Sequence, residues 1–163
     1  MDLEIMRGNI QQFDKIAQYI SWFQESNRQK VENLKKVNKP SVGFVSIYTP
    51  EEVFYAAGLV PFRITGEKGI PYNMARASLF ANLCPYILSC LEEGIKDIYS
   101  FSNSIVIVNS CDARRRFYDA WKHYISAPFV HLLDFPKIVS FDSKDYFKKQ
   151  IILLIKALEE HFQ

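Results

Sequence analysis

The sequence predicts an α/β fold, a Rossmann-like parallel sheet of about four strands with helices on both faces. Short runs rich in β-branched residues alternate along the chain with longer segments of helical periodicity. Such alternation favours a parallel sheet, and near-continuous apolar runs are typical of strands covered on both faces. At 163 residues the chain is expected to be a single domain, with a helical segment at 1–40, a core at 41–136 and a closing helix at 137–163.

The strands are predicted from apolar runs bounded by turn residues. The clearest run is SIVIVNS, which ends in polar residues. Pro61 cannot donate a hydrogen bond to a neighbouring strand, so its strand is expected at an edge of the sheet. The expected strands span residues 41–48, 59–65, 104–110 and 127–136.

The helices are predicted from apolar residues that recur every three or four positions. Thr49 is the expected N-cap of a short helix, with Pro50 in its first turn, and Gly58 is the expected stop. Pro85 is expected to start, kink or break the helical segment around it. The expected helices span residues 10–36, 51–57, 75–97, 112–124 and 142–161.

Composition excludes several classes of partner. Twenty basic against 18 acidic side chains give a net charge of +2, too small to indicate binding to nucleic acid or to an anionic membrane. No apolar run approaches the roughly 20 residues of a membrane span. The first residues lack the pattern of a signal peptide, so we expect a cytoplasmic protein. Three cysteines are too few for a disulfide scaffold, which leaves free thiols or metal ligation.

Two of the three cysteines are expected just before a helix. Cys111 follows the strand at 104–110, and Cys84 precedes Pro85. Ligands of parallel sheets bind at the carboxyl ends of the strands, and the free N–H groups of a helix start favour a thiolate. The alternative interpretation of Cys111 is a buried cysteine that packs as a small hydrophobe. Cys90 is expected in the core.

Three arginines follow Cys111. Arg114, Arg115 and Arg116 fall in the first turn of the predicted helix, where cations oppose the helix dipole. Asp112, as an N-cap, would offset part of this cost. A bound phosphate or anionic cluster would offset more, so these arginines are candidate anion-binding residues. The alternative is an ordinary solvated helix face.

Four segments together resemble one known family. They are VGFVSIYTPEEVFYAAGLVPFRITG, NLCPYILSCLEE, VNSCDARRRFYDAW and LLDFP. In this order and spacing, over residues 41–136, they are similar to blocks of the 2-hydroxyacyl-CoA dehydratase and benzoyl-CoA reductase family, in its D-component group.

The resemblance implies an enzyme that holds an iron–sulfur cluster, expected to be 4Fe-4S, between Rossmann-like domains. An ATP-dependent activator protein would supply one electron, which the cluster passes to an acyl-CoA thioester. The resulting ketyl radical expels a hydroxyl group, whereas the benzoyl-CoA branch reduces a ring. On this resemblance Cys84 and Cys111 are cluster ligands, and Arg114–Arg116 lie near the cluster or the CoA phosphates. Ser46 and Glu51 are candidate catalytic residues.

The chain differs from the family in length. Family members carry a further cluster cysteine in a second Rossmann-like half, so we expect an N-terminal domain or truncated component, completed by a second subunit or by a C-terminal half. Two alternatives remain open. One is a non-catalytic binding or assembly module of the same fold. The other is a redox-sensing protein in which Cys111 is the reactive thiol.

Overall fold

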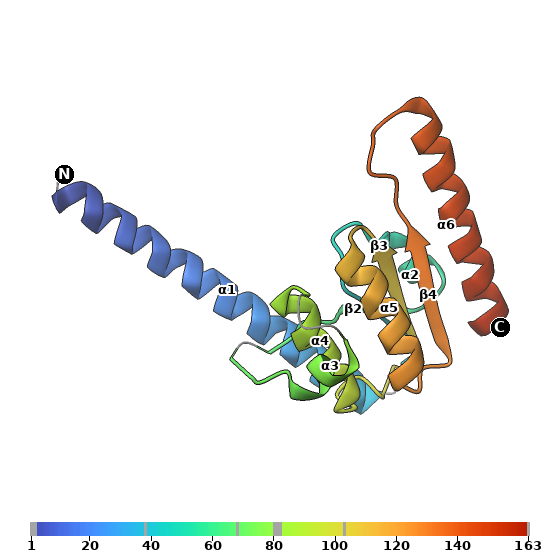
Figure 1. Cartoon of the computed structure of the whole chain (residues 1–163), viewed down its shortest axis with the longest axis horizontal. Helices are drawn as coiled ribbons and strands as arrows, with labels where there is room; N and C mark the ends of the chain where they lie inside the picture. Colours follow the sequence, from blue (N-terminus) through green and yellow to red (C-terminus); the bar gives the residue numbers. More distant parts are fainter. Residues whose placement is uncertain (1–2, 38, 68, 80–82, 103, 163) are drawn as a thin grey trace. The chain divides into compact units, whose positions relative to one another are not determined.

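A computed structural model of the chain confirms the α/β fold (Figure 1). It describes residues 3–37, 39–67, 69–79, 83–102 and 104–162, and the side chains of the first helix from Asp14 to Lys36. The chain forms two compact units that divide after Val37. The first unit is one helix, α1 (Leu3–Val37), slightly longer than predicted. Within the described ranges, every helix is too short or too polar to cross a membrane.

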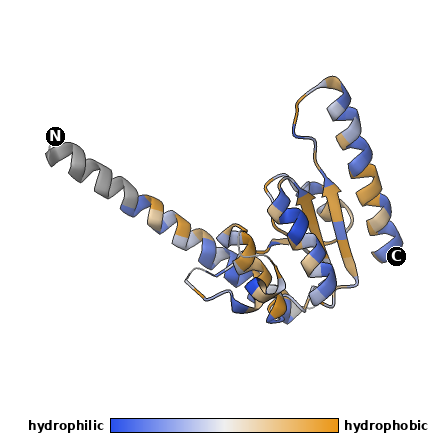
Figure 2. Ribbon diagram, in the orientation of Figure 1, coloured by the Kyte–Doolittle hydropathy of each residue, from blue (hydrophilic) through white to orange (hydrophobic). Residues whose placement is uncertain are grey.

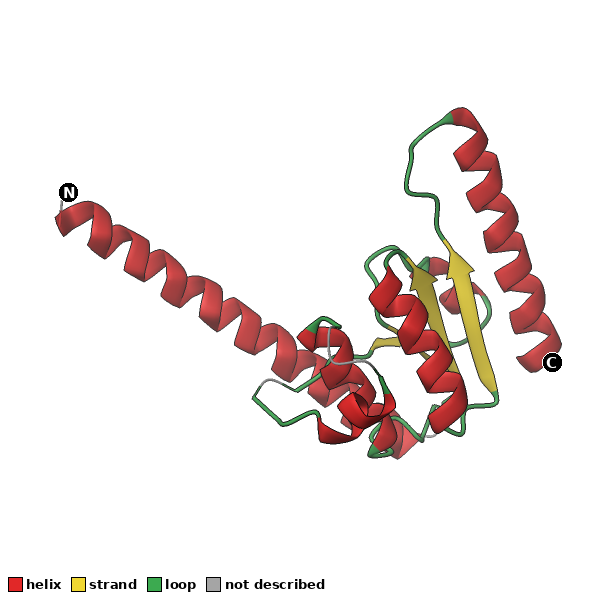
Figure 3. Cartoon of the chain, viewed as in Figure 1, coloured by secondary structure: helices red, strands yellow, loops and turns green. Residues whose placement is uncertain are grey.

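The second unit is built on a four-stranded sheet in which all neighbouring strands are parallel. The strand order is β2-β1-β3-β4, and β3 and β4 run side by side with their carboxyl ends at the same edge (Figure 3). Pro61 lies opposite Val42 in the edge strand β2, as predicted. The strands are β1 (Ser41–Phe44), β2 (Val60–Arg63), β3 (Ser104–Asn109) and β4 (Phe129–Asp134).

The helices of this unit follow the predicted order, with one division. Pro85 is the first residue of α4, so the predicted segment at 75–97 is two helices. The helices are α2 (Glu51–Ala56), α3 (Asn73–Ser78), α4 (Pro85–Ile95), α5 (Asp112–Tyr124) and α6 (Phe141–Phe162).

The ends of α2 are partly as predicted. Gly58 has a φ of 74°, the left-handed conformation that stops a helix. The N-cap, however, is Pro50 and not Thr49. Thr49 is only 8% exposed, and its hydroxyl has no hydrogen-bond partner among the described residues. Burial of this side chain in the turn after β1 therefore removes it from the helix end.

The two faces of the sheet carry different helices. Val106 and Val108 of β3 point to a core shared with Phe54 of α2 and Leu154 of α6. Because side chains alternate along a strand, Ile105 and Ile107 point to the other face, which α5 covers with α4 packed beside it. Colouring by hydropathy shows β3 and β4 as largely apolar (Figure 2). The two central strands, β1 and β3, are buried along almost their whole length. The sheet is thus buried on both sides, as its apolar runs predicted.

Candidate functional site

The strand order defines where a ligand would bind. From β1 the chain moves to one side to form β2 and then crosses to the other side to form β3. This reversal is a topological switch point, and ligands of such sheets bind beside the carboxyl ends of the two strands that flank it. The residues that follow these ends are Ser46–Tyr48 after β1 and Ser110–Cys111 after β3.

Cys111 lies at this switch point. It is the N-cap of α5, with an extended backbone (φ −157°, ψ 166°), and its side chain is exposed. Its carbonyl oxygen accepts the hydrogen bond of Arg115 N at 3.2 Å. Asp112, which the sequence suggested as N-cap, is instead the first helical residue. The chain therefore presents a thiol, and not a carboxylate, at the helix start, and the interpretation of Cys111 as a buried hydrophobe is wrong.

Cys84 has the same local arrangement on α4. It is the N-cap, its backbone is extended (φ −62°, ψ 141°), and its side chain is exposed. Its carbonyl oxygen accepts hydrogen bonds from Ile87 N at 3.1 Å and Leu88 N at 3.2 Å. Pro85 follows as the first helical residue, so the prediction that this proline starts the helix is confirmed.

Side chains hold the start of α4 at the carboxyl edge of the sheet. Tyr86 donates its hydroxyl to the carbonyl oxygen of Ile64 at 3.0 Å. Ile64 directly follows β2, and its N–H donates to Phe44 O, at the end of β1, at 2.7 Å. The first turn of α4 therefore lies beside the carboxyl ends of β1 and β2.

The far ends of α4 and α5 are packed together. A Cβ atom on Gly94 would lie 2.6 Å from the ring of Trp121, so these two residues are in close contact. Cys84 precedes Gly94 by ten residues, and Cys111 precedes Trp121 by ten. Ten residues correspond to about 15 Å of helix. Both thiols therefore lie at the carboxyl edge of the sheet, at the starts of two neighbouring helices.

Cys90 is in the core, as predicted. It is fully buried, and its thiol points at the carbonyl oxygen of Ile64, with a sulfur–oxygen distance of 3.9 Å. Burial raises the pKa of this thiol to about 12. Cys90 is therefore not available as a thiolate ligand or nucleophile.

Each of the three arginines has a partner inside the chain. Arg114 donates to the hydroxyl of Ser110, and Arg115 Nε donates to Asn109 Oδ1 at 3.3 Å. Arg116 forms an exposed ion pair with Asp112, with a nitrogen–oxygen distance of 3.7 Å. Because Ser110 is neutral, Arg114 keeps a net positive charge near Cys111, whereas the charge of Arg115 is partly balanced by the Asp134 carboxylate.

A polar network joins the ends of β3 and β4. Asn109 Nδ2 donates to Asp134 Oδ1 at 2.9 Å, and Tyr146 of α6 donates its hydroxyl to the other carboxylate oxygen. The hydrogen bond from Tyr146 is the main cause that lowers the pKa of Asp134, and Asn109 and Arg115 lower it further. Tyr146 was not singled out from the sequence, because its partner lies in a different element.

The two candidate catalytic residues after β1 differ in exposure. Ser46 is fully buried, and its hydroxyl accepts a hydrogen bond from Tyr48 N at 3.2 Å, which stabilises the turn. Glu51 is half-buried at the first position of α2. The ring of Tyr48 stacks on Phe135 after β4, with centroids 4.4 Å apart. This stack joins the segments that follow β1 and β4, at the carboxyl edge of the sheet.

The donor set suits a metal site only in part. Exposed cysteine thiolates are the usual ligands of iron–sulfur clusters, and Cys84 and Cys111 meet this condition. In the described part of the chain, no three His, Cys, Asp or Glu side chains are grouped so as to hold a metal ion. These residues can therefore contribute two ligands to a cluster whose remaining ligands come from elsewhere.

Comparison with known families agrees with this geometry. The family model for the D-component of 2-hydroxyglutaryl-CoA dehydratase matches residues 46–163, which include both exposed cysteines and the residues Ser46–Tyr48 and Ser110–Cys111 that follow β1 and β3. The chain belongs to this family. The family resemblance predicted from the sequence is therefore confirmed.

Individual proteins match this chain at low identity. The lactoyl-CoA dehydratase beta subunit of Anaerotignum propionicum is 30% identical over 87 residues, 53% of this chain and 23% of that protein. The (R)-phenyllactyl-CoA dehydratase beta subunit of Clostridium sporogenes is 25% identical over 83 residues, 51% and 22% of the two chains. A benzoyl-CoA reductase subunit of Thauera aromatica is 24% identical over 120 residues, which are 72% of this chain and 31% of that protein. The matched regions span about a fifth to a third of these relatives.

Proposed function

We propose that this chain is a component of an iron–sulfur enzyme that dehydrates a 2-hydroxyacyl-CoA, with Cys84 and Cys111 as two of the cluster ligands. The observation that carries the proposal is the pair of exposed thiols at one edge of the sheet, each at a helix start. Membership in the dehydratase family supports it. Ring reduction is the second candidate chemistry, because one relative is named as part of a benzoyl-CoA reductase.

The residues around the thiols would have distinct roles. A bound cluster, expected to be 4Fe-4S, would supply single electrons to the thioester. Arg114 and Arg115 would favour an anionic cluster or the CoA phosphates, since their positive charge lies beside Cys111. Glu51 is accessible enough to handle a substrate proton, whereas the buried hydroxyl of Ser46 would act by holding the turn after β1.

Two thiolates do not complete a cluster, so the proposal includes partners. The remaining ligands would come from a homologous second subunit or a C-terminal half, in keeping with relatives that are named as subunits. An ATP-dependent activator protein would deliver the electron. The cytoplasmic location remains a prediction from the sequence.

Anaerobic reconstitution with iron and sulfide tests the proposal, with the chain alone and with its proposed second subunit. We expect an absorption band near about 400 nm from thiolate-to-iron charge transfer. Cys84→Ala and Cys111→Ala should abolish the band. Cys90→Ala is the matched control and should retain it, because that thiol is buried. A preparation that takes up no cluster in either form would contradict the enzyme and favour the non-catalytic module.

A further inference from the structure

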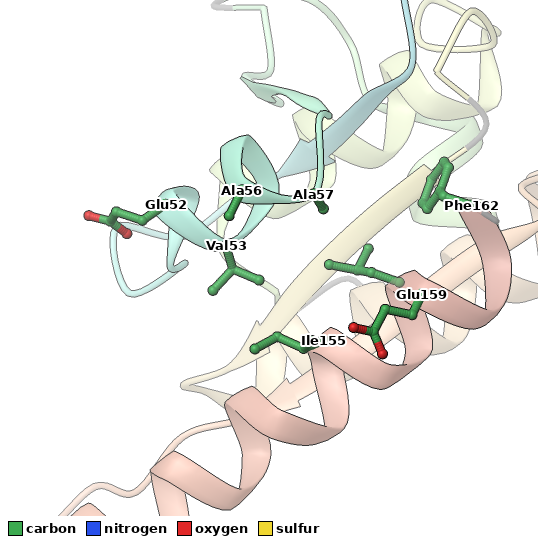
Figure 4. Close-up of a pocket in the computed structure, with 8 residues that line it drawn as sticks. Glu52, Val53, Ala56, Ala57, Ile155, Glu159 and Phe162 are labelled. Carbon is green, nitrogen blue, oxygen red and sulfur yellow. The ribbon is translucent and has the colours of Figure 1, made fainter.

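A groove of about 510 Å³ lies between α2 and α6, on the face of the sheet opposite α4 and α5 (Figure 4). Two carboxylates, Glu52 and Glu159, stand on its two walls, and neither forms an ion pair with a described residue. None of the cysteines, arginines or other candidate site residues lines it. The apolar lining is Val53, Ala56, Ala57, Ile155, Leu158 and Phe162.

Helix α1, taken by itself, carries an exposed apolar stripe. Ile16, Tyr19, Ile20 and Phe23 are between 47% and 72% exposed. Their spacing of three, four and seven residues puts them on one face of the helix. Lys15 precedes the stripe, and Lys30 follows it two turns later; within the described chain, neither lysine forms an ion pair.

We propose that α1 of one copy binds in the groove between α2 and α6 of a second copy, and that the exchange is reciprocal in a dimer. The stripe runs from residue 16 to 23, and the α6 wall from 155 to 162, so both extend over about 10 Å. An amphipathic helix that places its apolar face in such a groove is a recurring mode of recognition. The charges are complementary, because lysines flank the stripe and glutamates flank the groove.

Charge reversal tests this interface in the full chain by sedimentation at increasing protein concentration. We expect a concentration-dependent dimer, at least about tenfold weaker in Glu52→Lys/Glu159→Lys and in Lys15→Glu/Lys30→Glu. The four changes combined should restore it, because the opposite charges then meet again. Glu160→Lys and Lys36→Glu are matched controls, on the same helices but off the groove and stripe, and should dimerise normally. A chain that stays monomeric, or a dimer indifferent to the reversals, overturns the proposal.

Photo-crosslinking identifies which copy supplies the helix. A benzophenone amino acid at Ile20 of an isotopically heavy chain, mixed with light chain, should capture light peptides that contain residues 155–162. Capture only of heavy peptides at high dilution would mean that α1 binds within its own chain, which overturns the exchange between copies. Because the readout needs no cluster, its outcome is independent of the proposed enzyme function.

Discussion

The two helix starts that carry the exposed thiols share a local geometry but are held in different ways. Cys84 and Cys111 are both extended N-caps without a capping side-chain bond to the described residues. Cys111 comes two residues after the end of β3, so the strand itself positions it. Cys84 is reached from β2 through a connection of about 20 residues that includes α3, and strand continuity cannot position it.

Side-chain donors replace strand continuity at α4. Tyr86 and Ser89 of α4 donate to the carbonyl oxygens of Ile64 and Glu67 at 3.0 and 2.8 Å. Tyr99, which follows α4, donates to the carbonyl oxygen of Thr65 at 2.8 Å. The backbone just after β2 is therefore tied to the first half of α4 and to the segment that follows this helix. The difference between the helices implies that the position of Cys84 depends on tertiary hydrogen bonds, whereas that of Cys111 depends on the sheet. Substitutions on α4 should therefore affect Cys84 before they affect Cys111.

The largest expected difference is in the rate of alkylation, between the exposed thiols of Cys84 and Cys111 and the buried thiol of Cys90. Because burial raises the Cys90 pKa to about 12, very little of this thiol is ionised at pH 8, and exclusion of the reagent slows its reaction further. We expect iodoacetamide to modify the exposed Cys84 and Cys111 at least about 100-fold faster than Cys90, as measured by peptide mass spectrometry over time. The rate at Cys90 should rise with pH up to about 12. Slow modification of Cys84 would mean that its helix start is not exposed.

The sequence predicted this site wherever a single residue has a local effect. Pro85 starts a helix through its fixed backbone angle, which made Cys84 an N-cap. The polar end of an apolar strand run put Cys111 at the carboxyl edge of the sheet. Pro61 identified the edge strand because it cannot donate to a neighbour.

The errors came where the N-cap propensity of a side chain did not decide where the helix begins. Thr49 and Asp112 both have good N-cap side chains, yet Pro50 and Cys111 hold those positions. The side-chain hydrogen bonds that fix α4 join residues 17 to 22 positions apart, and no local pattern encodes them.

Glu92→Ala should produce the largest loss of stability on the α4 side of the comparison. The Glu92 carboxylate is 2% exposed, accepts Ala75 N of α3 at 2.9 Å and pairs with Lys96 at 3.2 Å. Its removal leaves a buried N–H unsatisfied, so we expect the free energy of unfolding to fall by about 2–3 kcal/mol in urea titrations. Glu92→Gln, which keeps an acceptor oxygen, should lose less. Glu160→Ala, at an exposed position of α6, should change the free energy of unfolding by under about 0.5 kcal/mol. Equal losses in all three variants would contradict the role of this carboxylate.

Tyr86→Phe removes one tether of α4 and leaves the packing in place. We expect a loss of about 1 kcal/mol, because the Ile64 carbonyl loses its hydroxyl donor. The same variant should speed hydrogen exchange in the first turn of α4 and leave the first turn of α5 unchanged, as followed by mass spectrometry. Tyr118→Phe, at a half-buried tyrosine of α5, is the matched control. Faster exchange in both first turns would show that the two helix starts are not held independently.

Tyr146→Phe should give the smallest effect, on the β4 side of the site. Tyr146 is the main cause that lowers the pKa of Asp134 below 3.8, so the ionised carboxylate is favoured in the folded state. A depressed folded pKa contributes stability that is present above pH 3.8 and is lost as the pH falls through the folded pKa. We therefore expect the variant to be only slightly less stable at pH 7, because the contact is exposed to solvent. In urea titrations the difference should shrink as the pH is lowered from 5 toward about 2. Tyr55→Phe, another exposed tyrosine, should show no such trend, and a difference that is constant with pH would mean that Tyr146 acts through packing instead of through Asp134.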